Sequence, residues 1–324
     1  MKGTKNNIRV AAAQFETKSG NKGYNLSVIK TLSKKAKGQK ADVVCFHEMC
    51  ITGYTFLKDL NPKQCVELAE EIPEGPSVNE LTQIAKENEI VILAGLVEKE
   101  ADHLFNTFVC VGGSGLIAKH RKLHPFINAC LSPGDQYTVF EINGWKCGIL
   151  ICYDNNIIEN VRATTLEGAE IIFAPHVTMC APSPFPGSGY VHKDLWDNRY
   201  DDPDALRREF DGPKGREWLM RWLPARAYDN AVYYVFSNPV GMEGDHLKNG
   251  NSLVLDPFGE VITEIKSFED EIAITDCTSD KLTIAGGYRY KNARRPELFG
   301  KILSSPNSGN VLPPWLKSFK TDEK

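Results

Sequence analysis

Cys152 combines a reactive side chain with a position in which chemistry is expected. It ends the apolar run Cys147–Cys152 and precedes a stretch from Ile157 with the pattern of a helix. Open α/β sheets present their reactive groups where a strand ends and a helix begins. Backbone N–H groups at such a point lower the pKa of a thiol and can bind an oxyanion. The sequence therefore predicts a nucleophilic thiol, with an inert buried cysteine as the alternative.

Glu48 and Lys122 have side chains that could assist this nucleophile. Glu48 follows the apolar run Val43–Phe46, and a carboxylate at the end of a buried strand can act as a general base. Lys122 lies in the basic segment 119–124 and could stabilise the negative charge of a tetrahedral intermediate. Alone, each residue could instead be a capping glutamate or a solvated lysine. Together with Cys152 they would suffice for covalent catalysis.

The elements that must position these residues alternate along the chain. Short apolar strands between amphipathic helices predict a layered α/β fold. Turn signals at 113–115 and 257–259 predict hairpins, so the sheets are expected to be mixed. We expect helices at 26–36, 77–88, 158–167 and 216–230, and strands at 8–14, 43–46, 91–96, 107–111, 147–152, 171–175, 232–238, 252–255 and 271–275.

The chain is expected to form one large domain, residues 1–303, followed by a polar tail, residues 304–324. Residues 181–214 are polar and aromatic and have no clear period. Long segments of this kind often leave the core as lids or binding loops. We therefore expect this excursion to bind substrate, for example a carboxylate through arginine or histidine, or to form a subunit contact.

The composition narrows the class of protein. Hydrophobic residues make up 42% and charged residues 25%, with a formal net charge of −4, which gives no sign of a nucleic-acid or membrane surface. We find neither a signal-peptide pattern nor an apolar stretch long enough to span a membrane. The nine cysteines are scattered and lack zinc-site spacing. We therefore expect no metal, no cofactor and a cytoplasmic location.

Many short motifs, taken in order and spacing, resemble the nitrilase superfamily of carbon–nitrogen hydrolases. The resemblance covers residues 8 to 302. It is carried by Ala12-Ala13-Gln14, Phe46-His47-Glu48, Gly53-Tyr54, Arg121-Lys122-Leu123-His124, Ser132-Pro133-Gly134-Asp135, the run from Gly148 to Asp154, Gly168-Ala169-Glu170, the run from Arg226 to Asn230, Gly250-Asn251-Ser252, Pro257-Phe258-Gly259 and the run from Arg295 to Leu298.

By this resemblance the fold is a four-layer α–β–β–α sandwich with two mixed β-sheets. Glu48, Lys122 and Cys152 fall on the family's catalytic constellation. Cys152 would form a thioester, Glu48 would act as the base, and Lys122 with the N–H of Tyr153 would hold the oxyanion. The residues expected at the oxyanion or the substrate are Tyr153, Tyr54, Asn128 and His176.

One interval departs from the family pattern. Many members have a second glutamate between the lysine and the Ser-Pro-Gly-Asp turn, whereas residues 126–131 contain no acid. Asn128 could supply a neutral hydrogen bond there or could be a plain turn residue. The missing acid motivates one alternative, a family member that has lost catalysis and acts as a binding protein.

The residues around the nucleophile carry some substrate information. Cys152-Tyr153-Asp154 resembles amidases and N-carbamoyl hydrolases more than true nitrilases. We therefore expect hydrolysis of a small amide or N-carbamoyl compound, with release of ammonia or an amine. Nitrile hydrolysis, acyl transfer to an amine and metal-dependent hydrolysis are the alternatives. The family also implies a homodimer or larger homo-oligomer, with the helix after Cys152 and the helix ending at Asn230 at the interface.

Overall fold

The computed structural model describes residues 5–180, 189–305 and 316. Most of the predicted tail 304–324, and residues 181–188 of the excursion, lie outside the described residues. Two six-stranded mixed sheets form the body, with strand orders β15-β1-β2-β3-β4-β5 and β14-β13-β10-β8-β7-β6. The central strands β1, β2 and β3 of the first sheet are parallel, as are β7, β8 and β10 of the second.

The two sheets and a small third one are formed by strands from all parts of the chain. The first sheet contains β1 (Ile8–Gln14), β2 (Val43–Cys45), β3 (Val91–Glu100), β4 (His103–Gly112), β5 (Gly115–Arg121) and β15 (Glu271–Cys277). The second contains β6 (Val139–Ile142), β7 (Trp145–Ile149), β8 (Ile171–Pro175), β10 (Tyr233–Ser237), β13 (Leu253–Leu255) and β14 (Val261–Glu264). The third contains β9 (Met179–Cys180), β11 (Val240–Glu243) and β12 (His246–Asn249).

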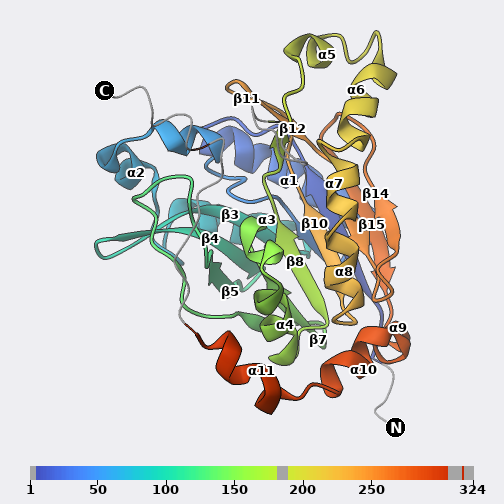
Figure 1. Cartoon of the computed structure of the whole chain (residues 1–324). Coiled ribbons are helices and arrows are strands. Elements are labelled where there is room, and N and C mark those ends of the chain that lie inside the picture. Colours follow the sequence, from blue (N-terminus) through green and yellow to red (C-terminus); the bar gives the residue numbers. More distant parts are fainter. Residues whose placement is uncertain (1–4, 181–188, 306–315, 317–324) are drawn as a thin grey trace.

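Helices cover the outer faces of the two large sheets (Figure 1). α1 (Lys22–Gly38) and α3 (Pro76–Asn88) pack on the first sheet, and α4 (Ile158–Leu166) and α8 (Leu223–Tyr228) pack on the second. A third apolar cluster fills the space between the sheets with side chains of both. The predicted four-layer α–β–β–α sandwich is therefore confirmed, and both predicted hairpins are present as β4–β5 and β13–β14.

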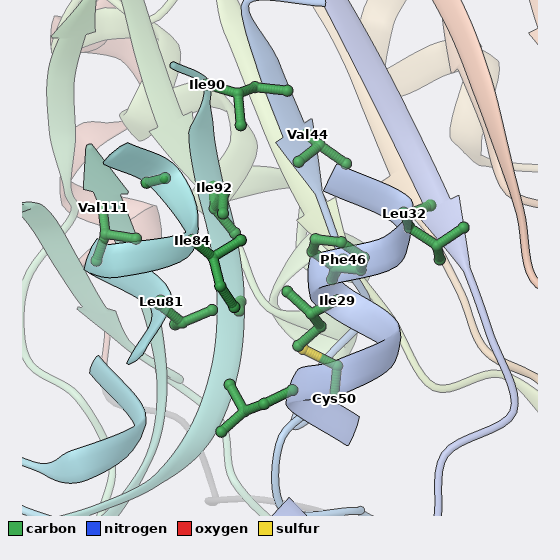
Figure 2. Close-up of a cluster of buried hydrophobic side chains, with 14 of the residues drawn as sticks. Ile29, Leu32, Val44, Phe46, Cys50, Leu81, Ile84, Ile90, Ile92 and Val111 are labelled. Carbon is green, nitrogen blue, oxygen red and sulfur yellow. The ribbon is translucent and has the colours of Figure 1, made fainter. Parts of the chain in front are cut away.

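The layer of α1 and α3 shows how apolar spacing builds the fold. Figure 2 shows Ile29 of α1 and Ile84 of α3 pointing into one cluster with Ile92 of β3. All three side chains are buried. Burying each contributes roughly 1.5–3 kcal/mol relative to exposure. This packing fixes the helices over the strands whose ends carry the candidate site.

The predicted helix 216–230 is wrong as a single element, because the structure has two. α7 (Arg216–Met220) ends before α8 begins at Leu223. Pro224 lies in the first turn of α8, where its missing N–H leaves no hydrogen bond unmade. In the interior of a continuous helix the same proline would break the hydrogen-bond ladder.

The excursion also differs from the prediction, since its described part contains α5 (Lys193–Asp197) and α6 (Pro203–Asp211). α6 starts with a recognisable signal: the Asp202 side chain accepts from the N–H of Ala205, and Pro203 occupies the first turn. Leu206 and Phe210 are fully buried in a cluster with residues of β11 and β12. The short apolar spacing of this helix was missed among its many charges.

The remaining helical elements are short. They are η1 (Thr55–Asp59), α2 (Pro62–Leu68), η2 (Cys152–Asn156), α9 (Asp280–Ile284), α10 (Gly286–Asn292) and α11 (Pro296–Leu303), of which η1 and η2 are 3₁₀ helices. Within the described ranges, no helix combines the length and the apolar character that crossing a bilayer requires.

Candidate active site

Glu48, Lys122 and Cys152 meet where strands of both large sheets end. Glu48 follows β2, Lys122 follows β5, and Cys152 opens η2 after β7. Lys122 Nζ lies 2.6 Å from Glu48 Oε1. The Cys152 thiol is close enough to Glu48 for the carboxylate to act on its pKa through charge and hydrogen bonding. The structure thus brings together the three residues that the sequence singled out.

Asn106 on β4 completes the surroundings of Glu48, and sequence reasoning missed it. Its Nδ2 donates to Glu48 Oε1 at 2.6 Å, and its carbonyl accepts from the N–H of Lys122 at 2.8 Å. Glu48 Oε2 is buried and accepts no hydrogen bond from a nitrogen or oxygen donor of the described residues. One carboxylate oxygen is therefore held in place, while the other stays available for a proton. The sequence feature that could have revealed Asn106 is its polar amide within the apolar run of β4.

Cys152 has an unusual backbone and an unusual thiol. Its φ is +50°, in the left-handed region that costs free energy for residues other than glycine and is often found at functional sites. Burial and the negative charge of Glu48, opposed by Lys122, raise the pKa of the Cys152 thiol to about 12. The expected lowering of this pKa is wrong, because desolvation and the carboxylate outweigh the backbone dipoles. At neutral pH the thiol is protonated and must give its proton to a base when it attacks.

Asp154 ties the nucleophile to the segment that carries the lysine. Its fully buried carboxylate accepts from the N–H groups of Leu123 at 3.1 Å, His124 at 2.9 Å and Ile151 at 3.2 Å. These bonds join the residues directly after Lys122 to the residue directly before Cys152. The motif residue Asp154 therefore fixes the relative position of two candidate catalytic groups.

Lys122 keeps its charge although it is buried. Its exposed fraction is 1%, and its Nζ lies 5.4 Å from the centre of the Tyr54 ring and 5.0 Å from that of Phe126. Burial alone would lower its pKa, but the carboxylates of Glu48 and Asp154, with the nearby sulfur of Cys152, prevail and raise it. A charged ammonium group in a site of low polarity stabilises an oxyanion far better than it would in water.

Tyr54, Tyr153 and His176 surround this centre. The Tyr54 hydroxyl is buried without a hydrogen-bond partner among the described residues, and burial together with the negative charge of Glu48 raises its pKa. The half-buried Tyr153 ring packs edge-on against Phe126. His176 is buried with its Nδ1 against the Ala174 carbonyl at 3.1 Å, and burial lowers its pKa to about 3. Their substrate contacts stay predictions.

Asn128 is engaged in structural contacts. Its Nδ2 donates to the carbonyls of Leu57 at 2.7 Å and Leu60 at 2.9 Å, and its Oδ1 accepts from the N–H of Cys130 at 2.9 Å. Both N–H bonds and the oxygen are used by the backbone. This geometry favours the turn-residue alternative over a substrate contact at the position of the missing acid.

A buried ion pair on the β11–β12 hairpin supports the Tyr54 loop. Glu243 Oε1 accepts from the N–H groups of Tyr54 at 2.8 Å and Thr55 at 3.0 Å, and Glu243 Oε2 lies 3.1 Å from Lys248 Nζ. Burial opposes ionisation, but Lys248 and Thr55 lower the pKa of Glu243 to about 2. Sequence reasoning missed this pair, because charged residues on a short hairpin are usually exposed.

The chain matches known proteins over most of its length. The family model for carbon-nitrogen hydrolase matches residues 9–284. This chain belongs to the carbon-nitrogen hydrolase family. Similar proteins include "Omega-amidase NIT2" of Xenopus tropicalis, 30% identical over 82% of this chain and 87% of that protein. "Nitrilase" of Pyrococcus abyssi is 29% identical over 83% of this chain and 89% of that protein.

A solved amidase shares the fold of this carbon-nitrogen hydrolase. The crystal structure of an amidase from Nesterenkonia sp. superposes with a TM-score of 0.67 at 20% identity, covering 93% of this chain and 98% of that one. Among the described residues of the present chain, no group of three or more His, Cys, Asp or Glu side chains is placed to hold a metal ion.

Proposed function

We propose that this carbon-nitrogen hydrolase cleaves a small amide or N-carbamoyl compound through a thioester on Cys152. The observation that carries the proposal is the meeting of a thiol, a carboxylate and a buried ammonium group at one point. One oxygen of Glu48 accepts from no nitrogen or oxygen donor in the part of the chain that the structure describes, and Lys122 Nζ lies 2.6 Å from the other oxygen. This is the set of groups that covalent acyl transfer needs.

The reaction divides into two balanced steps. As Cys152 Sγ bonds to the carbonyl carbon, its proton passes to Glu48, and Lys122 with the Tyr153 N–H stabilises the oxyanion. The C–N bond then breaks, and the proton on Glu48 goes to the leaving nitrogen, which departs as ammonia or an amine. A water that loses its proton to Glu48 next attacks the thioester. The C–S bond breaks, the acid is released, and Glu48 returns the proton to sulfur.

The relatives support an amide substrate. Alongside omega-amidases, "(R)-stereoselective amidase" of a Pseudomonas species is 28% identical over 94% of this chain. A structure of a mutant of the Nesterenkonia amidase shows covalent addition of the acetamide moiety of fluoroacetamide at that protein's active-site cysteine. Nitrile hydrolysis is less favoured, since one relative named a nitrilase stands beside several named amidases.

Ammonia release from a substrate panel tests the proposal. The panel contains N-carbamoyl amino acids, short dicarboxylate monoamides and aliphatic nitriles. We expect turnover of the first or second class, loss of turnover in Cys152→Ala, and normal turnover in Cys130→Ser, a matched thiol control that is also half-buried. Turnover that survives Cys152→Ala would refute the mechanism. A chain that releases no ammonia from any class would support the binding-protein alternative.

We also propose a homodimer or larger homo-oligomer that forms through α4 and α8. Ile158 and Leu166 on α4 and Tyr228 on α8 are exposed apolar side chains. A hollow between α4, α8 and α11 lies beside them. Sedimentation velocity should show a dimer or larger species, and Leu166→Glu should shift it toward the monomer. A wild-type monomer at micromolar concentration would contradict this.

Two further expectations rest on the arrangement of the chain. We propose a single domain for residues 1–303, because β15 near the end of the chain pairs with β1 near its start. We propose a cytoplasmic location, because the eight cysteines whose side chains the structure describes are free thiols. Cell fractionation tests the location. Limited proteolysis that released a stable half of the chain would contradict the single domain.

A further inference from the structure

A small cavity lies beside Glu48, between the end of β2 and the β11–β12 hairpin. The residues that line it include Thr17, His47, Glu48, Tyr54 and Val177. The space open to the centre of a water molecule is about 10 Å³. This is close to the minimum that holds one buried water. Two of the lining residues contact the nucleophile, because the Cys152 thiol hydrogen-bonds to the Glu48 side chain and to the backbone of Val177.

Two polar atoms of the lining residues have no hydrogen-bond partner within the described ranges. They are Nδ1 of His47 and the hydroxyl of Tyr54, whose residues are 1% and 3% exposed. Buried polar atoms in folded proteins nearly always have a hydrogen-bond partner, and a lone one needs an explanation. Glu48 Oε2 is a third such atom in the lining when only nitrogen and oxygen donors are considered. Three residues that line a space for one water therefore each carry a buried polar atom without such a partner.

His47 is held in place as a neutral ring. Its Nε2 lies 2.5 Å from Thr17 Oγ1, and its ring packs against Phe15 with centroids 4.5 Å apart. Burial lowers its pKa to about 3, so it carries no charge at neutral pH. In a neutral imidazole one nitrogen donates and the other accepts, so the contact with Thr17 decides which role Nδ1 has. The ring can therefore orient a water molecule without competing with Glu48 for its proton.

We propose that this cavity holds the water that hydrolyses the thioester, and that His47 is the residue that positions it. This inference rests on the proposed function. The water accepts or donates one hydrogen bond at His47 Nδ1, contacts the Tyr54 hydroxyl and gives its proton to Glu48. Its oxygen bonds to the acyl carbon, the C–S bond breaks, and the proton on Glu48 passes to Cys152 Sγ. His47 itself neither gains nor loses a proton in this step.

A matched pair of substitutions separates the two nitrogens of His47. The shorter asparagine side chain would place its amide near the position of Nδ1, and the longer glutamine side chain would place its amide near that of Nε2. His47→Asn thus keeps a polar atom at the cavity and loses the Thr17 contact, whereas His47→Gln does the reverse. We expect His47→Gln to lower kcat roughly 10²-fold, because a misplaced reactant costs about this much. We expect His47→Asn to retain most of the wild-type kcat.

The inference requires that the loss falls on deacylation alone. For His47→Gln, KM should fall in proportion to kcat, so that kcat/KM, which ends at acylation, is unchanged. Intact-protein mass spectrometry should show the acyl-enzyme accumulating at steady state. Hydroxylamine, an external nucleophile, should increase the share of product formed as hydroxamate. A residue that only supports the fold would lower kcat/KM as well and would leave the acyl-enzyme unpopulated.

The outcomes separate this inference from the proposed function. Equal losses of kcat and kcat/KM in His47→Gln, without acyl-enzyme, would overturn the water site and leave the hydrolase intact. If His47→Gln fails to fold, Tyr54→Phe removes the second unpartnered atom and must produce the same accumulation. If the wild-type chain neither releases ammonia nor acquires an acyl group from any substrate of the panel, the proposed function itself has failed.

Discussion

Lys122→Met is expected to destabilise the protein strongly while abolishing activity. The substitution leaves the Glu48 carboxylate buried, with Asn106 as its remaining nitrogen donor among the described residues. Glu48 and Lys122 are each 1% exposed, so water cannot replace the lost ammonium group without rearrangement. Removing one partner of a buried ion pair typically costs about 3–5 kcal/mol. We therefore expect a loss of stability in this range.

A second substitution tests whether the buried charge is the cause. Glu48→Gln in the Lys122→Met background replaces the unpaired carboxylate by a neutral amide of the same shape. The double variant should regain at least half of the lost stability and remain inactive. Recovery of stability without activity would show that the unpaired Glu48 carboxylate causes the loss of stability, independently of the loss of catalysis.

Urea unfolding, followed by circular dichroism, measures both effects. A loss of about 3 kcal/mol corresponds to a shift of the midpoint of about 1 M or more, given typical denaturant slopes. The reasoning would be refuted by a Lys122→Met midpoint equal to that of the wild type. It would also be refuted by a double variant less stable than Lys122→Met, because the pair would then not be a buried, mutually dependent unit.

Three further predictions follow from the structure. Because the pKa of Cys152 is raised to about 12, its alkylation by iodoacetamide should accelerate about tenfold per pH unit up to pH 9, and a plateau near pH 8 would contradict this. A Cβ at Gly95 would lie 2.5 Å from the backbone N of Met49, the residue after Glu48, so Gly95→Ala should displace Met49. We expect the substitution to lower the free energy of unfolding in urea by about 1–3 kcal/mol and to lower kcat. An unchanged kcat would contradict this prediction. The lowered pKa of Glu243 gives stability that is fully present above the ordinary glutamate pKa of 4.5 and is lost as the pH falls toward 2. The loss of stability in Glu243→Gln, relative to the wild type, should therefore shrink as the pH falls from 4.5 toward 2. A loss that is independent of pH would refute the lowered pKa of Glu243.

The parallel core of both sheets could be predicted because its strands are buried on both faces. β8 coincides with an apolar run that no polar residue interrupts, and β1 coincides with one that only Arg9 interrupts before the strand ends at Gln14. Two of the three candidate catalytic residues could be predicted for a related reason. Glu48 and Cys152 lie at the ends of such runs, and the ends of buried strands converge at one edge of the layered fold. Lys122 follows the basic, partly exposed strand β5, so only the order of the family motifs singled it out.

The contacts that hold the site in place could not be predicted, because they join polar residues distant in sequence. Glu243 and Lys248 look like exposed hairpin residues, and they are buried because they neutralise each other and because Glu243 binds the backbone at Tyr54. Asn106 looks like an irregularity in a strand until Glu48 lies beside it. A sequence pattern reports local period and burial, but it does not report which distant partner satisfies a buried polar group.

The Cys152 thiol and its proposed base, Glu48, belong to opposite sheets of the sandwich. Glu48 and Lys122 follow strands of the first sheet, whereas Cys152 follows a strand of the second. A chain that kept every strand hydrogen bond but loosened the apolar layer between the sheets would separate sulfur from carboxylate. Such a loosened chain would retain its far-ultraviolet spectrum and lose turnover. Catalysis is therefore a more sensitive gauge of sheet docking than any measure of secondary structure.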